Sequence, residues 1–395
     1  MTDETNGDVF PGARRAARYV EPEVTDIVSM GEPGPRRTPQ LIDVDDMPAQ
    51  PAPVVEAAAP VEAAPAAALA EAERTAIPES IFIDPVADLS TVSTLQAPVT
   101  ASRGFRGWLN SLGFKVAPGA REQQLIGAAD AFHHDQTIIR QATWTRAVSI
   151  LVANKKGGAG KTPTALLIGG VLAAVRGGSV CILEVSDDPG ALTFRAEGNP
   201  VIGLGELVHD VDRISSAGQL AGYTAPQTSF ASVIGTVGRR PRLTRENVVD
   251  AARVIDEYFT IRVMDSGNQP SSTAFDGAAE TADALVIPVL NAGDAVLEAV
   301  ATIDELRARG GRYAALADNA VVIRLTDGRP EHPEVVARVD QIIESMHVRA
   351  VYTVPYDPHI AERGQLSLSR LSTPTQYAFT AAAAGVVQSL KATVR

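Results

Sequence analysis

The sequence predicts an α/β domain with a doubly wound, mostly parallel sheet, preceded by a disordered N-terminal arm. Two observations carry this prediction. From about residue 146 onward, apolar runs of strand length alternate with longer segments of helical periodicity. Strands that are apolar throughout belong to parallel sheets whose two faces are covered by helices. The first hundred residues are rich in Pro, Ala and acidic residues instead.

The predicted domain covers residues 146–395. Its strands are expected in "AVSILVAN", "SVCILEV", "FTIRVMD", "ALVIPVL", "AVVIRL" and "RAVYTVP", and its helices in "TALLIGGVLAAVRG", "ENVVDAARVIDEY", "AVLEAVATIDELRARG" and "PEVVARVDQIIESM". A last helix, "PTQYAFTAAAAGVVQSLKATV", closes the domain. One face of this helix carries a narrow stripe made of Phe379, Ala382, Val386, Leu390 and Val394. Such a stripe suits packing on the sheet better than insertion into a membrane.

Residues 1–100 are predicted to form the disordered arm, because they hold too few large apolar groups to offset the entropy of ordering. This segment carries 17 Asp and Glu against 6 Lys and Arg, whereas residues 151–395 carry 27 against 23. The net charge of −12 is therefore mostly a property of the arm. Two interpretations stay open: a solvated tether, or a carrier of short docking peptides such as "SIFIDPVADL".

Residues 101–145 are predicted to form a basic amphipathic helical linker. Within 103–115, Phe105, Trp108, Leu109 and Leu112 fall at helical spacing, with arginine and lysine around them. Such a helix can pack onto the folded domain, and aromatic anchors beside arginine also suit a membrane surface or a protein partner. If the protein touches a membrane, this segment is the expected contact.

Composition also limits the class of protein. Cys181 is the only cysteine, so neither an internal disulfide nor a cysteine-rich metal site can form within one chain. No apolar run reaches the roughly 18 residues that a spanning helix needs, and "MTDETNGDVF" lacks the pattern of a signal peptide. A cytoplasmic location is therefore expected. Because the folded part is nearly neutral, the acidic overall charge does not argue against non-specific DNA binding.

The segment "NKKGGAGKT" predicts a phosphate-binding loop, because it lies between an apolar run and a helical segment. Gly157, Gly158 and Gly160 allow backbone amides to converge on phosphate oxygens at the positive end of the next helix. Lys161 is expected to reach the β- and γ-phosphates, and Thr162 to bind magnesium. Pro163 would stand in the first helical turn, where its missing N–H breaks no helical bond.

This loop resembles the deviant Walker A motif of the ParA and MinD ATPases. The resemblance covers roughly residues 146–395 and identifies Lys156, directly before Gly-Gly, as the signature lysine that crosses a dimer interface to the partner's nucleotide. Lys155 stands where a standard phosphate-binding loop has glycine, as in many ParA loops, and Ala159 lies between the loop glycines. The resemblance implies ATP and Mg²⁺ as cofactors, an ATP-dependent homodimer and an activating protein partner, with Lys156 and Lys161 as catalytic cations.

Later motifs extend the resemblance. Asp265, at the end of an apolar strand, resembles the Walker B aspartate that holds magnesium through water, and a lone buried acid at a strand end favours a functional reading. The segment "VYTVPYDPHIAERG" resembles the late strand whose following residues line the adenine pocket. This makes Pro355, Tyr356 and Asp357 candidates together with Arg324, although a simple turn after a strand explains the same residues nearly as well.

The segment "CILEVSDDPGALT" departs from the family pattern D-x-D-P-Q-G-N. In the family, the second aspartate helps to position the attacking water. Matched from the strand, Glu184 replaces the first aspartate and Ser186 replaces the second. Matched on the proline, Asp188 takes the second place and is the catalytic candidate. Nucleotide binding is therefore better supported than hydrolysis, and slow turnover that a partner stimulates is expected.

Two functions remain open at this point. One is a ParA/MinD-like ATPase that dimerises with ATP and positions a cargo such as a plasmid, a chromosome region or a protein complex. The other is a regulatory or accessory ATPase of a secretion system, because a long Pro/Ala-rich arm before a MinD-like domain resembles the accessory ATPases of type VII secretion. Iron–sulfur carriers of this superfamily need paired cysteines, and this chain has one cysteine. The superfamily's bacterial tyrosine kinases end in a tyrosine cluster, which "AAAAGVVQSLKATVR" lacks. Both classes are therefore set aside.

Overall fold

The computed structural model describes residues 119–394. The predicted arm and the 103–115 helix lie outside this range. The strands are β1 Val148–Val152, β2 Val180–Val185, β3 Ala225–Pro226, β4 Ser232–Ile234, β5 Ile261–Ser266, β6 Ala284–Leu290, β7 Val321–Leu325 and β8 Ala350–Val354. The longer helices are α4 Ala120–Gln141, α5 Lys161–Arg176, α9 Arg245–Tyr258, α10 Thr273–Thr281, α11 Gly293–Arg309, α12 Gly311–Asp318, α13 Pro333–Ser345 and α15 Thr373–Thr393. Shorter helical segments are α6 Leu192–Arg195, α7 Leu204–Asp210, η5 Val211–Arg213, α8 Ala217–Ala221, α14 Pro358–Ala361 and η6 Leu368–Arg370.

The strands form one sheet in the order β3-β4-β2-β5-β1-β6-β7-β8. Within residues 119–394, the strands of this sheet pair in parallel except for β3 with β4 at the edge. The doubly wound parallel sheet predicted from the sequence is therefore confirmed. The edge strands β3 and β4, and the short helices between β2 and β4, were not predicted.

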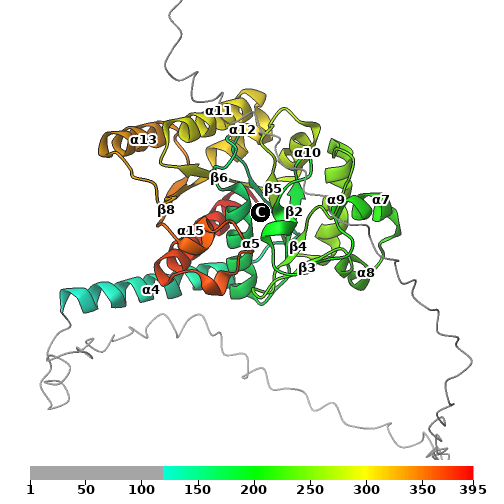
Figure 1. The fold of residues 1–395 in the computed structure, drawn as a ribbon, viewed down its shortest axis with the longest axis horizontal. Coiled ribbons are helices and arrows are strands. Elements are labelled where there is room, and N and C mark those ends of the chain that lie inside the picture. The colour runs from blue at the N-terminus through cyan, green and yellow to red at the C-terminus, as the bar shows by residue number, and fades with distance from the viewer. Residues whose placement is uncertain (1–118, 395) are drawn as a thin grey trace, which may run out of the picture. The chain divides into compact units, whose positions relative to one another are not determined.

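Both faces of the sheet are covered by helices (Figure 1). Alternate residues of a strand point to opposite faces. Accordingly, Ile150 and Val152 of β1 pack in the core beside α5 and α15, whereas Leu151 packs in the core beside α9 and α11. This two-sided burial explains why the central strands are apolar throughout.

The C-terminal helix α15 packs as its stripe predicted. Phe379, Ala382, Val386 and Leu390 are each 0% exposed and Val394 is 7% exposed. Small side chains bring α15 close to the sheet, and Gly385 lies directly beneath the ring of Tyr352 in β8. This face of α15 is therefore occupied by the protein's own core.

Helix α4 belongs to the same compact unit as the sheet. It lies beside α15 (Figure 1), and the rings of Phe132 and Tyr377 stack at 4.4 Å between centroids. The C-terminal end of α4 is fixed by Arg176 of α5, whose guanidinium donates to the carbonyls of Ile139 and Ala142 at 2.9 and 2.8 Å. Within residues 119–394, no helix is long and apolar enough to cross a membrane.

Candidate nucleotide site

A cleft of about 1390 Å³ opens at the carboxyl ends of the central strands. The loop after β1 forms its floor, and the segments after β2, β5, β6, β7 and β8 form its walls. Strand β1 lies between β5 and β6, where the chain turns to opposite sides of the sheet. Open α/β sheets bind their ligands at such a switch point.

The predicted phosphate-binding loop connects β1 to α5 and needs glycine at two positions. Gly158 and Gly160 have φ angles of 78° and 95°, in the left-handed region. A Cβ atom on Gly160 would also lie 2.3 Å from Cδ1 of Leu325, so the Leu325 side chain would have to move. Ala159 between them is fully buried, and Pro163 stands in the first turn of α5 as predicted.

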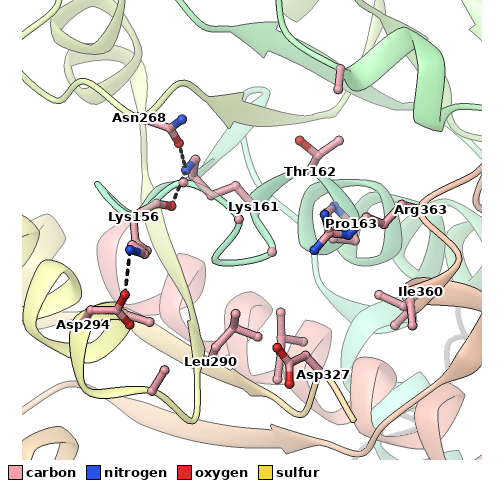
Figure 2. Close-up of a pocket in the computed structure, with 18 of the residues that line it drawn as sticks. Lys156, Lys161, Thr162, Pro163, Asn268, Leu290, Asp294, Asp327, Ile360 and Arg363 are labelled. Atoms are coloured by element: carbon pink, nitrogen blue, oxygen red, sulfur yellow. Dashed lines mark hydrogen bonds and ion pairs between the residues drawn. The ribbon is translucent and has the colours of Figure 1, made fainter. Parts of the chain in front are cut away.

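Lys161 lies inside this loop with its ammonium group fully engaged. Its Nζ donates to the carbonyl oxygens of Asn154 and Lys156 at 2.8 and 3.1 Å, and to Oδ1 of Asn268 (Figure 2). Burial lowers the pKa of Lys161 to about 8, and the nearby carboxylate of Asp265 opposes this shift. The loop therefore presents a preorganised cation at its centre.

Thr162 and Asp265 come together as predicted. The Thr162 hydroxyl donates to Oδ2 of Asp265 at 2.7 Å. Burial raises the pKa of Asp265 to about 7, and the second carboxylate oxygen, Oδ1, is buried without a hydrogen-bond partner. A hydroxyl and a carboxylate are ligands that Mg²⁺ prefers, and a buried unpaired oxygen is costly unless something binds it. These two residues fit a magnesium ion held beside the phosphates.

The two lysines that precede the glycines point to α11 instead of into the loop. Lys156 forms an ion pair with Asp294 at 2.6 Å (Figure 2), and Lys155 forms one with Glu305 at 2.7 Å. The side chains of Lys156 and Asp294 are 41% and 61% exposed, so the pair contributes only about 0–1 kcal/mol and breaks easily. Lys156 lines the cleft, whereas its loop neighbours Lys155 and Ala159 do not line it.

The segment after β2 is held by a residue that the sequence did not single out. The side chains of Arg240 and Glu184 are both 1% exposed and pair at 2.9 Å. Arg240 also donates to the carbonyl oxygens of Ser186, Asp187 and Asp188 at 2.8, 2.7 and 3.1 Å. The three arginines in "GRRPR" were the only local signal for this contact.

Ser186 and Asp188, the two candidates for orienting water, both lie in the segment after β2. The Ser186 hydroxyl donates to the carbonyl of Asp188 at 2.6 Å. The Asp188 carboxylate pairs with Arg242 at 2.9 Å, and both side chains are more than half exposed. Ser186 and Asp188 each line the cleft.

The four residues expected around adenine do not gather at one place. Pro355 and Asp357 line the cleft, whereas Arg324 and Tyr356 are not among its lining residues. Arg324 pairs with Asp340 and donates to Asn291, and the ring of Tyr356 packs over Gly328.

Asp357 is buried and has a clear structural task. It caps α14 by accepting from the His359 N–H at 3.0 Å, and it accepts from Ser372 at 2.9 and 3.0 Å. Burial raises the pKa of Asp357, but the hydrogen bonds from Ser372, Thr375 and His359 outweigh it and hold the pKa below its usual value.

Comparison with solved structures bears on the fold. A ParA family ATPase from Chlorobium tepidum TLS superposes with a TM-score of 0.51 at 14% identity, covering 60% of this chain and 98% of that one. The domain therefore has the fold of a ParA-family ATPase. Other neighbours of this ParA-like fold are McdA from Cyanothece (18% identity, 62% of this chain and 99% of that chain, TM-score 0.45) and MinD from Aquifex aeolicus (18%, 60% and 95%, 0.45). No protein-family model matches the sequence, and no curated protein matches it either.

Proposed function

We propose that the chain is a ParA/MinD-like ATPase that binds ATP with Mg²⁺ and dimerises in the ATP-bound state. The single observation that supports this most is the arrangement around the loop after β1. Lys161 presents a cation there, and Thr162 and Asp265 present metal-binding oxygens beside it. This set matches what phosphoryl transfer needs: a cradle of amides, a cation and a magnesium ion.

The position of Lys156 supports the proposed dimerisation. Its ammonium group is held by one exposed carboxylate at the mouth of the cleft, so it can leave Asp294 at small cost and reach the γ-phosphate of a second copy. A second cation at that phosphate stabilises the charge that develops during transfer and makes dimerisation depend on the bound nucleotide.

Binding of a fluorescent ATP analogue with Mg²⁺, measured by anisotropy, tests the site. Lys161→Ala should abolish binding because it removes the cation at the β- and γ-phosphates, whereas Lys391→Ala, an exposed lysine at the end of α15, should bind as the wild type does. Undiminished affinity of Lys161→Ala would rule out the site.

In the cell, the proposed role is to position a cargo from the cytoplasm, with a protein partner that stimulates slow hydrolysis. The long arm before the domain also supports the second function, an accessory ATPase of a secretion system. Stimulation of ATP turnover by DNA would favour cargo positioning on the nucleoid. Liposome binding that depends on residues 103–115 would point to a membrane as the working surface instead.

A further inference from the structure

Besides Arg329, which pairs with Asp327 at 3.1 Å, two arginines line the cleft away from the loop after β1. Arg195 lies at the end of α6, and Arg363 lies in the segment that follows α14. Figure 2 shows Arg363 and Ile360 on one side of the pocket and Lys156 and Asp294 on the other. Arg363 therefore belongs to a different wall from the lysine expected to act across a dimer interface.

Neither arginine has a carboxylate partner among residues 119–394. Arg195 is 8% exposed, and its Nε is buried without a hydrogen-bond partner. Glu362, which directly precedes Arg363, pairs with Arg370 at 3.6 Å and with His359 at 3.3 Å. A buried arginine with an unused donor and no counter-charge is costly unless a ligand completes it.

The two charges are also held near each other. Burial lowers the pKa of Arg195, and the charge of Arg363 lowers it further. The backbone enforces this arrangement: the carbonyl of Arg195 accepts from the Leu366 N–H at 2.8 Å, and its guanidinium reaches the carbonyl of Ile360 at 3.4 Å. Both ends of the segment that carries Arg363 are thus attached to Arg195.

Arg363 itself has a φ angle of 55°, in the left-handed region that non-glycine residues rarely adopt. Such a conformation is strained and persists only where surrounding structure imposes it. The wall of the cleft therefore combines a strained backbone at Arg363 with repulsion between the guanidinium groups of Arg195 and Arg363.

We propose that Arg195 and Arg363 form a second anion site that binds a phosphate group. Two guanidinium groups without an acid match the charge of a phosphate dianion better than that of a single carboxylate, and their planar donors suit its oxygens. The cleft of about 1390 Å³ exceeds the 300–1,000 Å³ typical of ligand pockets, so a nucleotide on the phosphate-binding loop leaves room for a second group. The proposal does not depend on ATP binding at that loop.

Titration of the full-length chain with inorganic phosphate, at ionic strength held constant with chloride, tests the site by calorimetry. In the Lys161→Ala background, phosphate should still bind. Adding Arg363→Gln should weaken it about tenfold or more, because a charge-assisted pair of hydrogen bonds is lost. Arg370→Gln, an exposed arginine of the same segment that lies outside the cleft, should leave the affinity unchanged.

Two further measurements keep the result interpretable. The phosphate titration is repeated on wild type saturated with ADP and Mg²⁺, in case Lys161→Ala does not fold. ADP affinity is then compared between wild type and Arg363→Gln, and it should agree within about twofold because the arginines lie outside the phosphate-binding loop.

Several outcomes would overturn the proposal. One is no phosphate binding in either background, and another is equal weakening by Arg363→Gln and Arg370→Gln. If Arg363→Gln weakens ADP instead, the arginines serve the nucleotide's own phosphates and no second site exists. If wild type fails to bind ATP while phosphate binding depends on Arg363, the proposed function fails and this site stands.

Discussion

Replacing Arg240 by methionine should destabilise the domain far more than replacing its neighbour Arg242. Arg240 and Glu184 form a buried pair whose side chains are each 1% exposed. Removing one member of such a pair costs about 3–5 kcal/mol, because the remaining charge stays buried without its partner. The matched variant Arg242→Met breaks a pair with Asp188 in which the side chains are 73% and 58% exposed, so it should cost about 0–1 kcal/mol.

The lower end of the larger range is expected for Arg240→Met. Glu184 keeps other donors after the substitution, including the Gly190 N–H at 3.0 Å and the Thr236 hydroxyl. We therefore expect a loss of about 3 kcal/mol in the free energy of unfolding. For a domain of this size that corresponds to a fall in Tm of roughly 6–12 °C.

Urea unfolding followed by circular dichroism, together with calorimetry, measures both variants beside the wild type. The double variant Arg240→Met, Glu184→Gln should recover most of the lost stability, because neither buried charge remains. If Arg240→Met lies within about 1 kcal/mol of Arg242→Met, the pair does not carry the energy assigned to a buried ion pair. A double variant that is less stable than Arg240→Met would refute the same reasoning.

The site makes three further predictions. Lys156→Ala should keep ATP binding but weaken the ATP-dependent dimer, and equal sedimentation of wild type and variant with ATP and Mg²⁺ would count against it. Ser186→Asp should raise basal phosphate release because a carboxylate can accept a proton from water and a serine cannot; if Asp188 already serves, Asp188→Ala should remove the activity that exists. Affinity for Mg²⁺-nucleotide should be highest between about pH 7 and pH 8. Below this window Asp265, with a pKa of about 7, is protonated. Above it Lys161, with a pKa of about 8, loses its charge. A flat affinity profile from pH 6 to pH 9 would contradict the last prediction.

The sheet and the loop after β1 could be predicted because their signals are local. Each central strand is an uninterrupted apolar run, and the glycines, Lys161 and Thr162 stand within a few residues of one another. Asp265 had a local signal too, because it ends an apolar strand in the way that the Walker B aspartate does. The structure joins it to Thr162 across 103 residues of sequence.

Arg324 shows where this logic stops. Its position in a late strand made it a candidate for the adenine pocket, but strand position does not decide which side chain turns into the cleft. In the structure Asp340 of α13 and Asn291 after β6 take its guanidinium. Those partners come from separate elements, and no spacing in the sequence indicates them.

The segment after β2 could not be interpreted from sequence for the same reason, and its two candidates are held in different ways. Arg240, which is 56 residues from Glu184, fixes the main chain of this segment through three carbonyl oxygens. Ser186 is tied into that network by its own hydroxyl, whereas the carboxylate of Asp188 is tied only to an exposed arginine. Breaking the exposed pair costs about 0–1 kcal/mol, so Asp188 can turn toward the cleft while the backbone stays in place. This difference makes Asp188 the stronger candidate for orienting water, and it predicts that Asp188→Ala lowers phosphate release more than Ser186→Ala does.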